Sequence, residues 1–360
     1  MSKKIIALAV AAAFSAPAFA DSANVTVYGQ AHLAYDQYSG DKSPAAVQNG
    51  GNLAPGASRL GFKGSEDVGS DLKVVYQYEV GIGLDGSSGT SGLLGAARDS
   101  YIGVAGGFGT VLAGRLPLAN QYANDANFFG GKIGDAGNFT AKNGVSSRIS
   151  NAVAYQSPKL GGASVLLAYV PNTNQGAATN TGATTAATTA QSVATKSPSY
   201  TVRADFAEGG IKAGVSYQNL STDKTKPSIK IVALGGGYDF GVARIAAQYV
   251  RNTNVAQVAG SNQNIVTIGG NFKLGENDAI SAQLVKAGQL GATLNSAATG
   301  YTVGFDHNLS KRSTLYAAYS AVSNQAAATF QATGYAHGGV GAPAAGEDPR
   351  VISVGVIHNF

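Results

Sequence analysis

Apolar and polar residues alternate with a period of two along most of the chain. In the clearest case, residues 72–80, Leu72, Val74 and Tyr76 share one face of an extended segment while Lys73 and Gln77 share the other. Successive side chains of a β-strand point to opposite faces, so this pattern predicts a strand with one apolar and one polar face. About sixteen segments of this type lie between residues 24 and 360, and none has the period of a helix. The predicted fold class is therefore all-β.

Short and long connections alternate between these segments. The short ones lie at 66–70, 106–109, 157–162, 207–210, 240–241, 274–278 and 309–313. The long ones lie at about 36–57, 82–97, 116–147, 170–198, 220–227, 252–263, 288–298 and 323–349. This alternation requires sixteen strands in an up-and-down meander, with all short turns and both termini at one end. Outer-membrane barrels have this asymmetry, whereas soluble sandwiches mix crossing connections.

A membrane imposes closure on such a sheet. No water is present in the bilayer core, so every backbone N–H and C=O must be paired internally and a sheet can have no free edge. We therefore predict a 16-stranded antiparallel transmembrane β-barrel whose first and last strands pair. A barrel of this size leaves a lumen wide enough for water, whereas about eight strands would be filled by side chains. The polar strand faces then line an aqueous pore.

The composition agrees with a barrel whose apolar face is outside. Charged residues make up only 12% of the chain, about half of what an average soluble domain contains. Outside the N-terminus, no run of 18 or more residues is apolar throughout, which excludes a bundle of membrane-spanning helices. The 17 tyrosines and 13 phenylalanines suit the aromatic girdles that border the membrane on such barrels.

Residues 1–20 have the pattern of a secretory signal peptide. Lys3 and Lys4 precede an apolar run, and Ala18 and Ala20 form a small-x-small cleavage site. The mature chain, 21–360, is then a single barrel domain, and its formal charge falls from +5 to +3 because the two lysines leave. No basic run survives, so nucleic-acid binding is not expected. The absence of cysteine fits an exported protein that is stabilised by its hydrogen-bond ladder.

Several motifs in order along the chain resemble a known family. They are VTVYG at 25–29, RLGFKG at 59–64, RDSYIG at 98–103, GGFG at 106–109, NLSKR at 308–312 and VGVIHNF at 354–360. Together they resemble the general diffusion porins of Gram-negative outer membranes, most closely the neisserial and other beta-proteobacterial branch. The resemblance implies a homotrimer in the outer-membrane lipid that passes ions and small hydrophilic solutes, without cofactor or catalysis. It also implies that the barrel-assembly machinery reads the terminal Phe360.

The same resemblance implies where the pore is narrowest. The third long loop, 116–146, is expected to fold into the lumen and to face a basic wall. The implied wall residues are Arg59, Arg98, Arg115 and Arg148, and the implied acidic residues of the loop are Asp125 and Asp135. The alternation places the side chains of Arg59 and Arg148 inward. On a regular strand Arg115 would point outward, and it is retained because its strand ends there.

Ion preference follows from the charges expected in this narrow zone. Arginine does not lose its proton in proteins, so a cluster of arginines stays charged even where like charges repel. Four arginines and two loop lysines, Lys132 and Lys142, face two loop aspartates. We therefore predict modest anion selectivity. Acidic residues elsewhere on the predicted inner wall, such as Glu79 and Asp306, would weaken it.

Other functions have weaker support in the sequence. The segment 81–86 matches G-x-G-x-x-G but is followed by a Gly- and Ser-rich stretch, whereas a dinucleotide site requires a helix there. The four histidines lack the spacing of a metal site. An outer-membrane barrel enzyme remains possible in principle, but no catalytic group can be assembled. A substrate-specific channel is the closer alternative, because it differs from a general porin only in the lining of its lumen.

Overall fold

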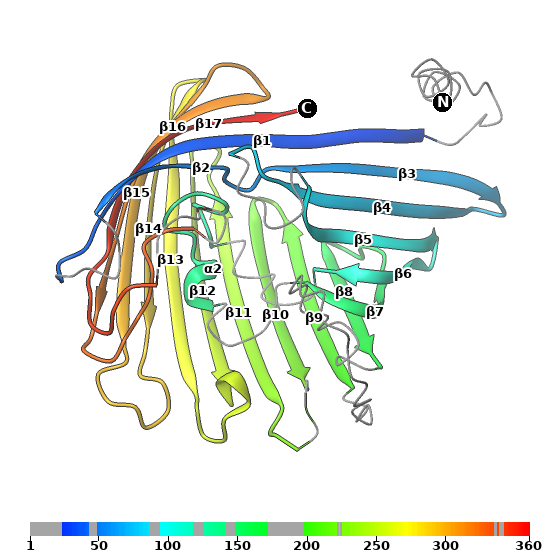
Figure 1. The fold of residues 1–360 in the computed structure, drawn as a ribbon. Helices are drawn as coiled ribbons and strands as arrows, with labels where there is room; N and C mark the ends of the chain where they lie inside the picture. Colours follow the sequence, from blue (N-terminus) through cyan, green and yellow to red (C-terminus); the bar gives the residue numbers. More distant parts are fainter. Residues whose placement is uncertain are drawn as a thin grey trace, which may run out of the picture.

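The computed structural model describes residues 24–42, 49–85, 94–117, 126–140, 148–171, 198–221, 223, 225–334, 337 and 342–360. They form one antiparallel sheet (Figure 1). Its strands are β1 (Asn24–Ser39), β2 (Gly50–Ala54), β3 (Arg59–Gly69), β4 (Leu72–Ile82), β5 (Leu94–Gly106), β6 (Gly109–Leu116), β7 (Ile149–Gln156), β8 (Ala163–Val170), β9 (Ser199–Glu208), β10 (Ile211–Leu220), β11 (Ile229–Asp239), β12 (Ala243–Thr253), β13 (Gln263–Leu274), β14 (Asp278–Ala287), β15 (Ala298–Asn308), β16 (Ser313–Asn324) and β17 (Arg350–Asn359). The described helical segments are α2 (Gly137–Thr140) and the 3₁₀ turn η5 (Val255–Gln257).

The sheet closes on itself between β1 and β17. Ten residue pairs join these two strands, from Gln30 opposite Asn359 to Ser39 opposite Arg350. Apart from the short β2, which pairs with β1 alone, every other strand pairs with a strand on each side, so the sheet forms a closed ring. In Figure 1 the strands of one wall cross the direction of those on the other, as expected for strands tilted about a barrel axis. The predicted closed barrel is confirmed.

Strands β2 and β3 together form one strand of this barrel. Both pair with β1 on the same edge, β2 through Ala54 opposite Ala34 and β3 through Arg59 opposite Gln30. Four residues separate β2 from β3, whereas only three residues of β1 lie opposite them, so this side has one extra residue. One of the four is Pro55, which has no N–H to donate to a ladder. Counting the pair as one strand gives the predicted sixteen.

The connections also follow the prediction. Six of the seven short turns lie where the sequence places them, and the turn between β3 and β4 lies at 70–71 instead of 66–70, because β3 continues to Gly69. The first long loop is shorter than the predicted 36–57, because β1 continues to Ser39 and β2 begins at Gly50. The consecutive polar residues Asp36 and Gln37 interrupt the alternation, so the sequence does not indicate that β1 continues through them. The predicted signal peptide, residues 1–20, lies outside the described residues.

The two faces of the strands differ as the alternation predicts. Along β17, Ile352, Val354 and Val356 are exposed on the outside of the barrel, while Val351 and Ser353, which alternate with them, are buried. The same holds around the ring, where most of the large exposed hydrophobic side chains alternate with polar or small inner residues. Among the described residues, no helix is long and apolar enough to cross a membrane.

Replacing Val354 with arginine tests which face meets lipid. Val354 lies in the middle of β17 and is 58% exposed, so we expect Val354→Arg to destabilise the folded barrel by about 2–4 kcal/mol. The measurement is the refolded fraction in lipid vesicles over a urea series. Val354→Leu is the matched control and should refold like the original chain. An unchanged refolded fraction for Val354→Arg would contradict the assigned outer face.

Candidate pore constriction

A buried glutamate joins two of the predicted arginines. The Arg98 Nε contacts one carboxylate oxygen of Glu79 on β4, and the Arg59 Nε lies 3.7 Å from the other. The Tyr28 hydroxyl donates to the same carboxylate at 3.0 Å. The Glu79 side chain is 6% exposed, whereas the two arginines are 28% and 26% exposed. The carboxylate is therefore enclosed while both guanidinium groups remain in contact with solvent.

The other two arginines lie beside a second carboxylate. The Arg148 Nε donates to Asp99 on β5. Arg115 donates through Nε to the Ala97 carbonyl at 3.0 Å and through Nη1 to the Ser150 hydroxyl at 2.8 Å. The charge of Arg115 interacts with those of both Arg148 and Asp99.

The two pairs belong to one group, because the charge of Arg59 interacts with those of both Arg98 and Arg148. All four predicted arginines are thus brought together. We call them, with Glu79 and Asp99, the arginine group.

A bulge in β5 places Arg98 and Asp99 on the same side. The β4–β5 register passes from Val80 opposite Ala97 to Tyr78 opposite Ser100. Two residues, Arg98 and Asp99, therefore oppose the single Glu79. Adjacent residues of a regular strand point to opposite faces, whereas a bulge redirects one of them. Sequence alternation did not identify Asp99 as a member of the group for this reason.

A second irregularity lies beside Arg115. The β6–β7 register shifts between Gly114 and Leu116, and Gly114 has φ +146°, a conformation that glycine adopts without steric cost. A Cβ at this position would overlap the Ser100 carbonyl of β5. In the β5–β6 ladder Arg115 pairs in regular register with Ser100, so its place on the wall stays a prediction, which its hydrogen bond to Ser150 supports.

Part of the third loop packs on the opposite wall. The Phe128 N–H donates to the Gln283 side chain on β14 at 2.8 Å, and that amide donates back to the Gly134 carbonyl at 2.9 Å. Lys132 forms an ion pair with Asp306 on β15. Gln283 is buried beside the outward Leu284, so it lies on the inner face. Residues 126–140 therefore contact the inside of the barrel.

Asp135 stabilises this loop segment. Its carboxylate accepts hydrogen bonds from the Asn127 side chain at 2.6 Å, the Gly131 N–H at 2.9 Å and the Gly137 N–H at 2.7 Å. No ion pair joins it to an arginine among the described residues. The described contacts of Asp135 thus lie within the loop, and its expected role as a partner of the wall stays a prediction. Asp125 and Lys142 lie outside the described residues.

The arginine group carries an excess of positive charge. It contains four arginines but two carboxylates, so within the described residues two positive charges are not balanced. Lys132 adds little to the excess, because it is neutralised by Asp306. Glu79 was expected to weaken the anion preference, and its contacts show that it lies within the group. The excess therefore remains after its charge is included.

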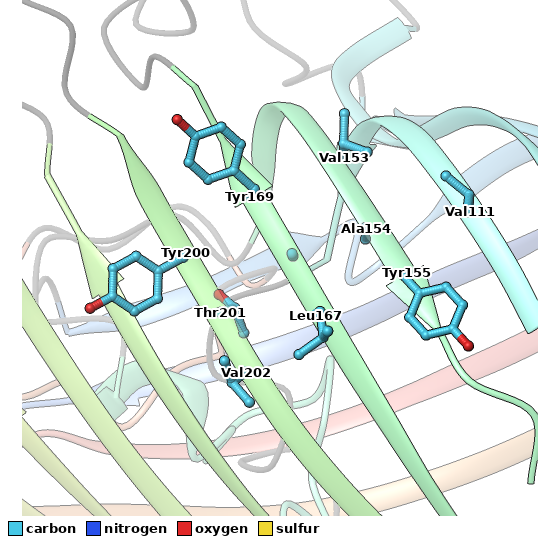
Figure 2. A pocket seen from close by; sticks show the side chains of 10 residues that line it. Val111, Val153, Ala154, Tyr155, Leu167, Tyr169, Tyr200, Thr201 and Val202 are labelled. Carbon is cyan, nitrogen blue, oxygen red and sulfur yellow. The ribbon is translucent and has the colours of Figure 1, made fainter.

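Other site classes find no support in the described part of the chain. No group of three or more His, Asp or Glu side chains could hold a metal ion there. Residues 81–85 of the 81–86 motif are described, and they lie at the end of β4 and in the turn after it. A shallow pocket lies on the outside of β6–β9, lined by Val153, Leu167, Tyr169 and their neighbours (Figure 2). These side chains are exposed on the lipid face, so this pocket is not part of the pore.

Comparisons with known proteins agree with the fold and the site. The profile of the Gram-negative porin family matches residues 7–327. The chain belongs to this family. This porin is 29% identical to Outer membrane porin protein 32 of Delftia acidovorans over the full length of both chains. It is 35% identical to Major outer membrane protein P.IB of Neisseria gonorrhoeae over 184 residues, about half of each chain. The resemblance to the beta-proteobacterial branch is confirmed.

Solved structures show the same fold. An anion-selective porin from Comamonas acidovorans superposes with a TM-score of 0.73 at 24% identity, covering 94% of this chain and all of the other. The trimer form of OmpT, an outer membrane protein of Vibrio cholerae, superposes with a TM-score of 0.66 at 15% identity, covering 94% and 100%. As a member of the porin family, this chain is an outer-membrane channel protein and not an enzyme.

Proposed function

We propose that this porin is a passive diffusion channel with modest anion selectivity. The arginine group carries the proposal, because within the described residues it holds four arginines and two carboxylates on the wall of a barrel wide enough for water. A fixed positive wall attracts anions and repels cations of similar size. The similar solved porin from Comamonas acidovorans is described as anion-selective, which supports the same sign here.

The third loop is proposed to narrow this channel. Residues 126–140 contact β14 and β15 on the inner face, while β6 and β7, which flank the loop, carry Arg115 and border Arg148. A loop that reaches from one wall to the opposite one must cross the lumen. The passage beside it then runs along the arginine group, where a permeating ion would be subject to its charge.

The assembled state is proposed to be a homotrimer. The similar OmpT structure from Vibrio cholerae is of a trimer form, and a lipid-facing barrel with the same topology can assemble in the same way. We further propose that residues 1–20 are a signal peptide removed on export. Phe360 is proposed to be the signal read by the barrel-assembly machinery.

Planar-bilayer recording tests the proposed function. With purified protein in a KCl gradient, we expect stepwise conductance and a reversal potential of the sign that marks chloride as the more permeant ion. Three equal steps per insertion would indicate a trimer of open pores. A reversal potential of the opposite sign would refute the anion preference, and a bilayer that stays silent would refute the channel.

A further inference from the structure

Two connections meet inside the barrel. Residues 328–334 and 337, from the connection between β16 and β17, lie against residues 126–140 of the third loop. The Gly134 N–H donates to the Ala332 carbonyl at 2.9 Å, and the Phe139 ring stacks on Phe330 with centroids 4.8 Å apart. Both rings are buried. The last long connection therefore supports the loop that is proposed to narrow the channel.

A single histidine joins these two connections to the barrel wall. The His337 Nδ1 lies 2.6 Å from Asp36 Oδ2 on β1, and its Nε2 lies 3.2 Å from the Gly131 carbonyl oxygen of the third loop. Both the His337 and Asp36 side chains are 0% exposed. We call this set of contacts, Asp36–His337–Gly131, the His337 bridge.

The bridge requires a proton that a neutral histidine cannot supply. A carbonyl oxygen only accepts, so Nε2 must carry a hydrogen to bond Gly131. An ionised Asp36 also only accepts, so Nδ1 must carry a second hydrogen. The ring with both hydrogens is an imidazolium, which forms a buried ion pair with Asp36. If the shared proton rests on Asp36 instead, the pair still holds the same number of protons.

Losing this proton breaks one of the two contacts. A neutral ring has one N–H, which can serve Asp36 or Gly131 but not both. If Nε2 keeps its hydrogen, the Nδ1 lone pair faces a buried carboxylate; if Nδ1 keeps it, a lone pair faces the Gly131 carbonyl. Asp36 would also lose its counter-charge, and its Oδ1 has no hydrogen-bond partner among the described residues. A buried unpaired charge is strongly unfavourable.

The neighbouring side chains His32 and Tyr38 do not supply the positive charge that Asp36 would lose with this proton. His32 stacks edge-on against His337 at 5.4 Å, but it makes both of its contacts as a neutral ring, accepting from the Ala57 N–H and contacting the Tyr316 hydroxyl. Tyr38 donates a neutral hydrogen bond to Asp36 at 3.1 Å.

Lys132, a neighbouring cation, does not take the place of the charged His337 either. Lys132, adjacent to Gly131, forms an ion pair with Asp306 and lies 4.7 Å from the Tyr316 ring. No further ion pair involves Asp36 among the described residues. His337 is therefore the cation that balances Asp36.

We propose that His337 is a positioning residue that holds the third loop and the last long connection against β1 only while the bridge is protonated. The inference rests on the proposed function, because it concerns the loop that narrows the channel. When the pair loses this proton at higher pH, the bridge loses one contact. The loop then moves more freely and the open channel becomes wider and noisier.

Single-channel recording across a pH series, from mildly acidic to alkaline, tests the bridge. The original porin should show a several-fold rise in open-channel current noise, with higher conductance, as the pH increases. His337→Ala removes the bridge and should be noisy at every pH. Asp36→Asn should stay quiet at every pH, because the asparagine amide can donate to Nδ1 while a neutral ring donates Nε2–H to Gly131.

The control is a histidine outside the bridge. His307 pairs with Asp278 at 2.7 Å near a short turn and is 43% exposed, so His307→Gln should keep the original pH response. If Asp36→Asn retains that response, or His337→Ala matches the original at acidic pH, the bridge is refuted. The absence of any channel would refute the proposed function instead. If Asp36→Asn does not assemble, His337→Ala decides, since residue 337 lies outside the strands.

Discussion

Replacing Arg148 with glutamate is expected to abolish or reverse the anion preference of the channel. Arg148 contacts Asp99 within the arginine group, and Arg148→Glu lowers the local charge by two units, which cancels the excess. In water, one unit charge about 6 Å from an ion contributes about 0.7 kcal/mol, so two contribute about 1.4 kcal/mol. This corresponds to about a tenfold change in local ion concentration, reduced by salt screening. The reversal potential in a KCl gradient measures the change.

Two control variants separate local charge from other effects. Lys311→Glu changes the total charge of the chain by the same two units, but it lies in the turn between β15 and β16 and should leave the reversal potential nearly unchanged. Arg148→Lys keeps the charge and should keep its sign. An equal shift for Lys311→Glu and Arg148→Glu would show that total charge, not the arginine group, sets selectivity. Because residue 148 faces the lumen, all three variants should assemble.

Strand positions could be predicted from the sequence because each strand separates two different solvents. Lipid on one side and water on the other impose a strict alternation, and a slip of one residue would reverse every side chain. Turn length added independent information, since seven short turns and eight long loops allow only an even number of strands. Both signals depend on local sequence alone, and both agree with the structure from β3 to β17.

The arginine group could be predicted only in part, because bulges change the alternation. Arg98 and Asp99 both lie opposite Glu79, and the β6–β7 register shifts beside Arg115. In a period-two pattern, an extra residue in a strand is visible only as a residue whose type does not suit the face that the alternation assigns to it. Arg115 was such a residue. A charged residue with outward parity near a strand end is therefore a signal for a bulge.

The loop contacts could not be predicted because they join distant parts of an aperiodic sequence. Asp135 bonds to donors within its own loop, and a pattern does not distinguish such a carboxylate from one that faces the pore. His337 and Asp36 are 301 residues apart. Their pairing depends on barrel closure, which brings the first strand beside the last connection. Only the folded structure shows these pairs.

Removing the ring of Phe360 is expected to impair assembly in cells far more than refolding in vitro. The main chain of Phe360 exchanges hydrogen bonds with Gly29 at 3.0 and 3.1 Å, which extends the pairing of β17 with β1. Its ring lies over Gly29, where a Cβ would overlap it, and is 49% exposed toward lipid. Phe360→Ala keeps both main-chain bonds and loses about 1 kcal/mol of apolar burial. The closed barrel should therefore remain stable.

Comparing assembly in cells with refolding in lipid vesicles separates recognition of Phe360 by the assembly machinery from its effect on barrel closure. In cells, Phe360→Ala should lower the folded porin in the outer membrane several-fold, measured by its heat-modifiable gel mobility, because the proposed assembly signal is the exposed ring. In lipid vesicles the same variant should refold close to the original yield. Deleting Phe360 also removes both bonds to Gly29, which leaves a strand edge unpaired where no water can compensate, so it should lower both yields. His358→Ala, which removes the neighbouring outward ring, is the matched control. If Phe360→Ala assembles in cells as well as His358→Ala, the terminal ring is not the signal.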